Sequence, residues 1–178
     1  AIPPAKSKRY QSSIKKAVNY LRKNQKEDGT WLPLWFGNQQ HQKQHNPVYG
    51  TARVTAYLND MLNCSWISEQ LKLRLISIVE KAQLYLLSVQ NSDGSWGGDS
   101  GLRGTIEETS LAISALANKL EAKPQSELGL QWLEQQEIPL KAAPIGLYFA
   151  SLWYSEKLYP QVMYMEAMMR VKETTFHQ

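Results

Sequence analysis

The sequence predicts an all-α protein in which pairs of helices stack side by side as αα-hairpins. Two observations lead to this prediction. A sixteen-residue pattern occurs twice, at 16–31 and at 81–96, and each copy is followed by a second apolar stretch with helical spacing, at 49–62 and at 105–120. Strand-like alternation of apolar and polar residues is scarce. We therefore expect about seven helices.

The two copies define the first repeated element. Residues 16–31 read KAVNYLRKNQKEDGTW and residues 81–96 read KAQLYLLSVQNSDGSW, with eight of sixteen positions identical and a period of 65 residues. Ala17, Tyr20 and Leu21 fall at i, i+3 and i+4, the spacing of one apolar helix face, and the second copy repeats it. An Asp-Gly dipeptide then ends each helix, since glycine readily adopts the positive φ that such a turn needs.

The glutamine and tryptophan of each copy have a structural explanation. A glutamine at a helix end can pair with backbone groups that lack helical partners, and its amide can stack on the indole that the turn folds back. Such a pair would clamp each repeat to its neighbour. We therefore predict stabilising roles for the residues of this motif, which are Gln25, Gly29, Trp31, Gln90, Gly94 and Trp96.

The remaining helices follow from spacing. The stretches 49–62 and 105–120 each have a threonine near the start and small residues that allow close packing, as in an inner layer. Residues 69–90 form one long or broken outer helix. Three further helices are expected: a weaker outer helix without the Gly-x-Trp turn, its inner partner and a last helix, at 128–138, 144–160 and 161–171.

Composition limits the classes of protein and site. The net charge of +4 comes mostly from lysine-rich ends and lacks any nucleic-acid-binding motif, so we expect a solvated surface and no nucleic acid. The single cysteine, Cys64, excludes an internal disulfide framework and favours a reducing compartment. No apolar run reaches the ~18 residues that span a bilayer, and residues 1–20 lack the apolar region of a signal peptide.

Both copies of the motif resemble the QW repeats of the triterpene cyclases, the family of squalene-hopene and oxidosqualene cyclases. The segments NPVYGT (46–51), TIEETSLAISAL and LYFASLWYSEKLYP also resemble stretches of that family. The resemblance covers 14–171, which leaves a basic N-terminal segment (1–13) and a tail (172–178). It implies an α/α-toroid, part of an α6-α6 barrel, of which this segment would make about half a ring.

The resemblance also implies an isoprenoid substrate. In these cyclases an aromatic cavity folds a polyene such as squalene, a DxDD motif protonates it, and ring faces stabilise the carbocations. Leu147 stands where the family usually has an aromatic residue, and Pro47 replaces a tyrosine. The candidates for the cavity wall are Trp35, Tyr49, Glu108, Leu147, Tyr148 and Tyr154, and the tyrosines and tryptophans of 148–154 could equally belong to the core.

The acid of the family is missing. The aspartates are Asp28, Asp60, Asp93 and Asp99, and no two of them have DxDD spacing, so the segment is expected to be inactive alone and its catalytic residues are unknown. Glu107 and Glu108 are adjacent at a predicted helix start. Without neighbours that would raise the pKa of either carboxyl, we interpret them as charges that favour the helix dipole.

No metal or cofactor is predicted. His41 and His45 are four residues apart, but they lie in a polar, glutamine-rich loop with no evident third ligand. The lack of an Asp-x-Cys pattern at Cys64 also counts against a protein prenyltransferase β-subunit, whose zinc needs Asp, Cys and His.

Three functional classes stay open. The chain is the C-terminal portion of a polyene cyclase, a diverged non-catalytic module that binds an isoprenoid or a protein, or a prenyltransferase-like subunit. A half-ring would expose its apolar concave face, so we expect contact with an upstream part of the same barrel or self-association. The family resemblance further implies peripheral contact with the cytoplasmic side of a membrane.

Overall fold

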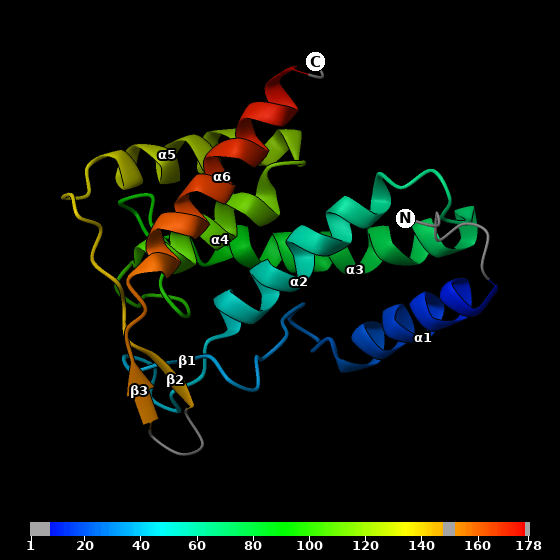
Figure 1. Ribbon diagram of the computed structural model, residues 1–178, viewed down its shortest axis with the longest axis horizontal. Coiled ribbons are helices and arrows are strands. Elements are labelled where there is room, and N and C mark those ends of the chain that lie inside the picture. Colours follow the sequence, from blue (N-terminus) through cyan, green and yellow to red (C-terminus); the bar gives the residue numbers. More distant parts are fainter. Residues whose placement is uncertain (1–7, 148–151, 177–178) are drawn as a thin grey trace.

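The computed structural model describes residues 8–147 and 152–176, and Figure 1 shows that helices dominate this part of the chain. The helices are α1 (Lys8–Asn24), α2 (Pro47–Leu62), α3 (Glu69–Ser88), α4 (Ile106–Leu116), α5 (Lys123–Glu134) and α6 (Leu158–Phe176). A 3₁₀ turn (Leu120–Ala122) precedes α5, and the strands are β1 (Gly37–Asn38), β2 (Ile145–Leu147) and β3 (Leu152–Tyr154).

The helices form layers around α4. Helix α2 packs against α3 on one side and α4 on the other, while α4 also contacts α5 and, most extensively, α6. All 11 residues of α4 are buried. Its sequence IEETSLAISAL suits this position, because small and aliphatic side chains allow neighbouring helices to approach closely on every side.

Local sequence signals start the helices. Asn46 caps α2 by accepting a hydrogen bond from the Tyr49 amide, Pro47 follows in the first turn, and Ser68 caps α3 in the same way. Thr105 caps α4 by accepting a hydrogen bond from the Glu108 amide. These are the side chains that satisfy the unpaired amides of a first helical turn.

The helix predicted for 144–160 is wrong. Its described part contains β2 and β3, which pair antiparallel, and β1 adds to the other edge of β2. Gly146 faces Gly37 in this sheet, and a Cβ on Gly146 would come within 2.1 Å of the Leu152 carbonyl oxygen, so the hairpin requires glycine there. The following helix, α6, begins at Leu158, and the described residues therefore contain six α-helices.

Two buried clusters form the core. One surrounds Trp31 and includes Val18, Leu75 and Ala82, so it lies between α1 and α3. The other surrounds Trp96 and joins α4 to residues of α5 and α6, such as Leu133 and Met163. Among the described residues, no helix combines the length and apolarity that crossing a bilayer requires.

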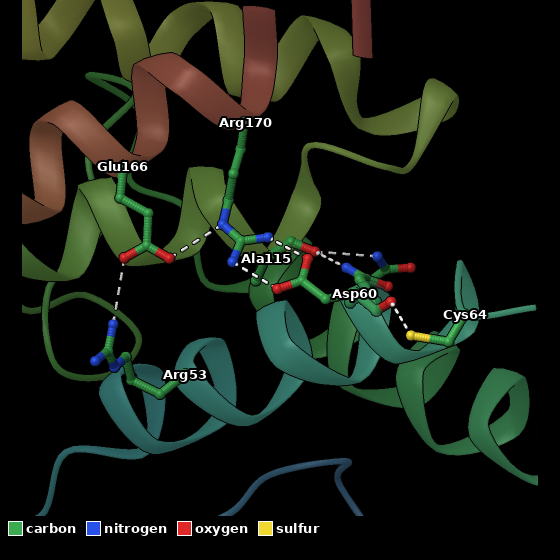
Figure 2. A network of polar contacts seen from close by, with 8 residues as sticks. Arg53, Asp60, Cys64, Ala115, Glu166 and Arg170 are labelled. Carbon is green, nitrogen blue, oxygen red and sulfur yellow. Dashed lines mark hydrogen bonds and ion pairs between the residues drawn. The ribbon is translucent and has the colours of Figure 1, made fainter. Parts of the chain in front are cut away.

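Polar side chains tie α6 to α2, as Figure 2 shows. Glu166 accepts hydrogen bonds from Arg53, at 3.4 Å, and from Arg170, at 3.1 Å. Arg170 also forms a two-pronged pair with Asp60, in which Nη2 lies 2.9 Å from Oδ2. Beside this network, the Asn59 and Gln83 amides both donate to the carbonyl oxygen of Ala115 in α4. Helix α6 is thereby held across α4 (Figure 1).

Candidate functional site: a buried carboxyl beside stacked aromatic rings

The Asp-Gly turns connect each outer helix to the next one. Gln25 Nε2 donates to the carbonyl oxygen of Ile78 in α3, at 2.8 Å, and to that of Gly29, at 3.0 Å. Trp31 Nε1 donates back to the Leu21 carbonyl at 2.8 Å. Gly29 has φ of +90°, and a Cβ there would lie 2.5 Å from the Lys81 carbonyl oxygen. The turn is therefore pressed against the backbone of α3.

The second turn repeats this geometry on α5. Gln90 Nε2 donates to the carbonyl oxygens of Gln125, at 2.9 Å, and Gly94, at 2.8 Å, while Trp96 Nε1 donates to that of Leu86 at 2.7 Å. Gly94 again has φ of +90°. These side chains face backbone atoms and the core, so their geometry is that of structural links.

Each turn is also fixed to an inner helix by a threonine that the sequence reasoning missed. The Trp31 amide donates to Thr51 Oγ1 at 3.1 Å, and the Trp96 amide donates to Thr109 Oγ1 at 2.9 Å. The available signal was that both predicted inner helices have a threonine in their first turns. Inner and outer layers are joined through these hydrogen bonds.

Glu108 is a buried carboxyl between segments that lie far apart in the sequence. Its Oε1 accepts hydrogen bonds from Asn46, at 2.7 Å, and Asn38, at 3.3 Å, and the residue is 4% exposed. Burial raises the pKa of Glu108 to about 7, and nearby Glu107 adds to the rise, whereas the Asn46 and Asn38 hydrogen bonds oppose it. The expectation that nothing raises this pKa is therefore wrong.

Glu107 lies beside it and is 1% exposed. Its Oε1 accepts a hydrogen bond from the Ala143 amide at 2.9 Å, and burial raises its pKa. Among the described residues, Oε2 of Glu107 and Oε2 of Glu108 have no hydrogen-bond partner. A charged oxygen without a partner is costly in a dry interior, so this environment favours the protonated carboxyls.

Aromatic rings lie next to this carboxyl. Tyr49 is 6% exposed and stacks on Phe36, with ring centroids 4.6 Å apart and planes inclined by 20°. Burial raises the pKa of Tyr49 to about 12, with further contributions from Tyr159, Glu108 and Tyr154, while Arg53 opposes the rise. Tyr49 and Glu108 share a partner, because Asn46 accepts the Tyr49 amide hydrogen and donates to the Glu108 carboxyl.

The sheet brings one of these phenols to the helices. Asn38 pairs with Ile145, and Ile145 pairs with Tyr154, so the three side chains lie on one face of the sheet. Asn38 binds Glu108 from that face. The hairpin thus takes the place of the predicted inner helix beside the carboxyl.

The predicted cavity residues do not surround an open cavity in the described part of the chain. Trp35 and Tyr154 are 53% and 45% exposed, whereas Tyr49 and Glu108 are buried. Leu147 is in β2, opposite Leu152, and Tyr148 lies outside the described residues. A cleft of about 890 Å³ lies elsewhere, between the ends of α2, α4 and α6, where Asp60, Leu116 and Arg170 line it.

The four aspartates have structural partners. Asp28 and Asp93 accept hydrogen bonds from Thr30 and Ser95 within the two turns, and Asp60 pairs with Arg170. Asp99 accepts a hydrogen bond from Tyr85 at 2.9 Å and lies 3.3 Å from His41 Nε2. None of them is part of a paired-carboxyl acid.

His41 and His45 are not arranged with a third metal ligand from the described residues. The rings of His41 and His45 stack with centroids 5.5 Å apart, and His41 Nδ1 accepts the amide hydrogens of Lys43 and His45. In residues 8–147 and 152–176, no three His, Cys, Asp or Glu side chains are grouped as metal ligands.

Clamped helix turns in two layers are the architecture of a terpene-cyclase α/α-toroid, and similarity to known proteins agrees with this class. Residues 4–137 match the family described as the squalene-hopene cyclase C-terminal domain. The chain belongs to this family.

Individual relatives give the same result. Squalene-hopene cyclase of Zymomonas mobilis is 28% identical over 164 residues, which cover 85% of this chain and 21% of that protein. Enfumafungin synthase of Hormonema carpetanum is also 28% identical, over 163 residues that cover 85% of this chain and 11% of the relative. The chain therefore spans between a tenth and a quarter of the length of these proteins.

A solved structure supports the fold. The ent-copalyl diphosphate synthase from Streptomyces platensis matches with a TM-score of 0.68 and 20% sequence identity, over 92% of this chain and 29% of that one. Together with the six described helices, this match confirms the predicted α/α-toroid fold.

Proposed function

We propose that this chain supplies part of the wall of an apolar cavity that holds an isoprenoid polyene in a longer protein, and that it does not start the cyclisation itself. The observation that carries the proposal is a run of exposed apolar side chains on α6, which follows the exposed Leu152 and Tyr154 of β3 along the chain and consists of Leu158, Val162, Met165 and Met169.

The run lies along one side of α6. Leu158, Val162, Met165 and Met169 follow one another at spacings of four, three and four residues, and each is at least 59% exposed. The opposite side of the helix buries Met163 and Ala167 against α4. A helix that is apolar on both sides is normally covered on both sides. A polyene, which has only apolar surface and attracts no charged groups, fits the uncovered side.

The described residues offer no suitable proton donor. Protonation of an alkene needs a strong acid, and a carboxyl becomes a weaker acid as its pKa rises. Glu108, with a pKa of about 7, is therefore a poorer donor than an ordinary glutamic acid. The aspartates are already engaged: two of them accept hydrogen bonds within the turns, one pairs with Arg170 and one lies beside His41. The missing acid would have to come from another part of a longer protein.

Two measurements on the 178-residue chain test the proposal. Incubation with squalene, followed by extraction and mass spectrometry, should give no cyclic product. A photoreactive isoprenoid should label peptides that contain α6 or β3, and Met165→Lys should reduce the labelling about fivefold, since it places a charge in the apolar run. Leu73→Lys is the matched control, because Leu73 is 68% exposed on α3, away from this run.

Either part of the proposal can fail separately. Cyclic products from the chain alone would contradict the lack of an acid. Equal labelling of Met165→Lys and the unchanged chain would contradict the cavity wall.

A second candidate, a non-catalytic helical module, is favoured by the way α6 covers α4. All residues of α4 are buried, Tyr49 is also buried, and Phe36, which stacks on Tyr49, is partly buried. The two candidates differ in the longer parent protein. Conversion of squalene by that protein supports the cavity wall of a cyclase, whereas binding without turnover supports the module.

A further inference from the structure

The clamps between outer helices have a donor side and an acceptor side. The donor side is the turn, with its glutamine, aspartate, glycine and tryptophan. The acceptor side lies on the next outer helix. In the first clamp, Gln25 donates to the Ile78 carbonyl and Gly29 lies against the backbone of Lys81. In the second clamp, Gln90 donates to the Gln125 carbonyl and Gly94 lies against the backbone of Leu128. Positions in α3 and α5 therefore correspond with a constant offset of 47 residues.

The acceptor side also contains a small residue and an aromatic one. Ala82 of α3 is fully buried in the cluster around Trp31, and its counterpart in α5 is Gly129, where a Cβ would lie 2.8 Å from the ring of Trp96. The aromatic residue lines the same cleft as the turn's aspartate. Tyr85 and Asp28 line one cleft, and their counterparts Trp132 and Asp93 line another.

Helix α1 carries the same acceptor side. The period of 65 residues places Ser13, Ala17 and Tyr20 at the positions of Ile78, Ala82 and Tyr85. In α3 the counterparts Ile78 and Ala82 are 4% and 0% exposed. In α1 all three residues are exposed, Tyr20 to 67%, and Tyr10, the counterpart of the buried Leu75, is 58% exposed.

The last described outer helix, α5, is not followed by a donor turn. Beyond α5, the positions that correspond to Gln90, Gly94 and Trp96 hold Glu137, Lys141 and Ala143. The neighbouring Gln136, just past the end of α5, donates to the Trp132 carbonyl of that helix, and the Ala143 amide donates to Glu107. A second copy of this chain therefore offers no free clamp, because Gln25 and Gln90 are both engaged.

We propose that the face of α1 formed by Tyr10, Ser13, Ala17 and Tyr20 is the docking site for a preceding unit of the same repeat. That unit is a helix that ends in Gln-x3-Gly-x-Trp. Its glutamine donates to the Ser13 carbonyl, its glycine turn presses on the backbone near Lys16, its tryptophan covers Ala17, and its aspartate approaches Tyr20. The inference rests on the proposed place of the chain in a longer protein, but not on any isoprenoid.

A tandem chain tests the docking site. A second copy of residues 8–68 is placed directly before residue 4, because residue 4 stands one period before Glu69, the first residue of α3. Cys64→Ser is introduced in every copy, so that Ala17→Cys in the original α1 is the single thiol. The rate at which a maleimide labels this cysteine then measures how accessible the face of α1 is. We expect labelling in the tandem chain to be at least about tenfold slower than in the single chain.

Two controls separate docking from general crowding. Lys15→Cys should react equally in both chains, because its counterpart in α3, Glu80, stays exposed beside the first turn. Gln25→Ala together with Trp31→Ala, in the added copy only, should restore fast labelling at position 17.

Equal labelling of position 17 in the tandem and single chains would overturn the docking site. So would an added copy that stays unfolded by circular dichroism, since the acceptor would then fail to hold a matching unit. Neither result bears on the proposed isoprenoid-binding wall, which is tested by squalene conversion and by photolabelling of α6 in the single chain.

Discussion

Single side chains connect distant parts of this protein, and Gln90 is a clear case. Its amide donates to one carbonyl within its own turn and to another in α5. Gln90→Ala leaves both carbonyls without this donor, so the free energy of unfolding should fall by about 1–3 kcal/mol, measured by urea denaturation. Gln136→Ala is the matched control, because Gln136 bonds only within its own helix region, and its effect should stay within about 0.5 kcal/mol. Equal losses for the two variants would contradict the role of the clamp.

The buried carboxyl of Glu108 should make stability depend on pH. Its folded-state pKa of about 7 lies above the ordinary value of 4.5, so the folded protein holds this proton more tightly than the unfolded chain. The resulting stability is fully present below pH 4.5 and is lost as the pH rises through 7. For a fully buried group the loss amounts to about 3 kcal/mol.

Glu108→Gln keeps an acceptor for Asn46 and removes this titration. The variant should be more stable than the unchanged protein at pH 8 and should show a flatter profile between pH 4 and 8, measured by urea denaturation. A residual slope of the same sign is expected from Glu107, whose pKa is also raised. Glu134→Gln, at an exposed position on α5, should leave the profile unchanged. An unaltered profile in Glu108→Gln would contradict the role of this carboxyl.

The environment of Glu108 could not be predicted from the sequence. Thr105 and the acidic pair form a local signal for a helix start, and that part of the prediction agrees with the cap of α4. Burial has a different origin. Asn38 and Asn46 precede Glu108 by 70 and 62 residues, and only the folded chain brings them to its carboxyl. A surface charge and a buried acid look alike in the first turn of a helix.

Helix α6 is an element whose position depends on charges as well as apolar contacts. Arg170 joins Asp60 of α2 to Glu166 of its own helix, as Figure 2 shows, and Asp60 raises the pKa of the Arg170 guanidinium. A double-mutant cycle with Asp60→Asn and Arg170→Met should give a coupling energy of about 1 kcal/mol that falls with added salt. Asp60 is 47% exposed, which keeps this value small.

The Glu69–Lys72 pair on α3 is the matched control for that cycle, since it joins two residues of one helix with Glu69 84% exposed. Its coupling should not exceed about 0.5 kcal/mol. Hydrogen exchange should also show faster opening of α6 in Arg170→Met. A coupling near zero for both pairs would contradict the role of Arg170 in holding α6.

Elements were predictable where the local pattern decided them. Apolar spacing and the Asp-Gly turns sufficed for α1, α2, α3 and α4. The hairpin of β2 and β3 was missed, because a short apolar stretch with residues such as Leu152 and Trp153 fits both a buried helix and a strand. Gly146 was the available signal, since glycine weakens a helix but permits the close approach of Leu152.

The whole molecule exposes a continuous apolar run on α6, and this should affect its state in solution. The average mass should increase with concentration in sedimentation experiments, because Met165 and its neighbours can be covered by another copy. Met165→Glu should keep the protein monomeric, whereas Leu73→Glu on α3 should not change the association. A monomer at all concentrations would contradict this prediction.

The order of the clamps along the chain has a consequence for folding during synthesis. In both clamps the turn that donates the hydrogen bond precedes its acceptor helix, since Gln25 precedes Ile78 and Gln90 precedes Gln125. During translation each donor turn therefore leaves the ribosome before its acceptor helix. Helices α3 and α5 can then each dock on a turn that has already been synthesised. Assembly can then advance in one direction, from the N-terminus, at the pace of translation.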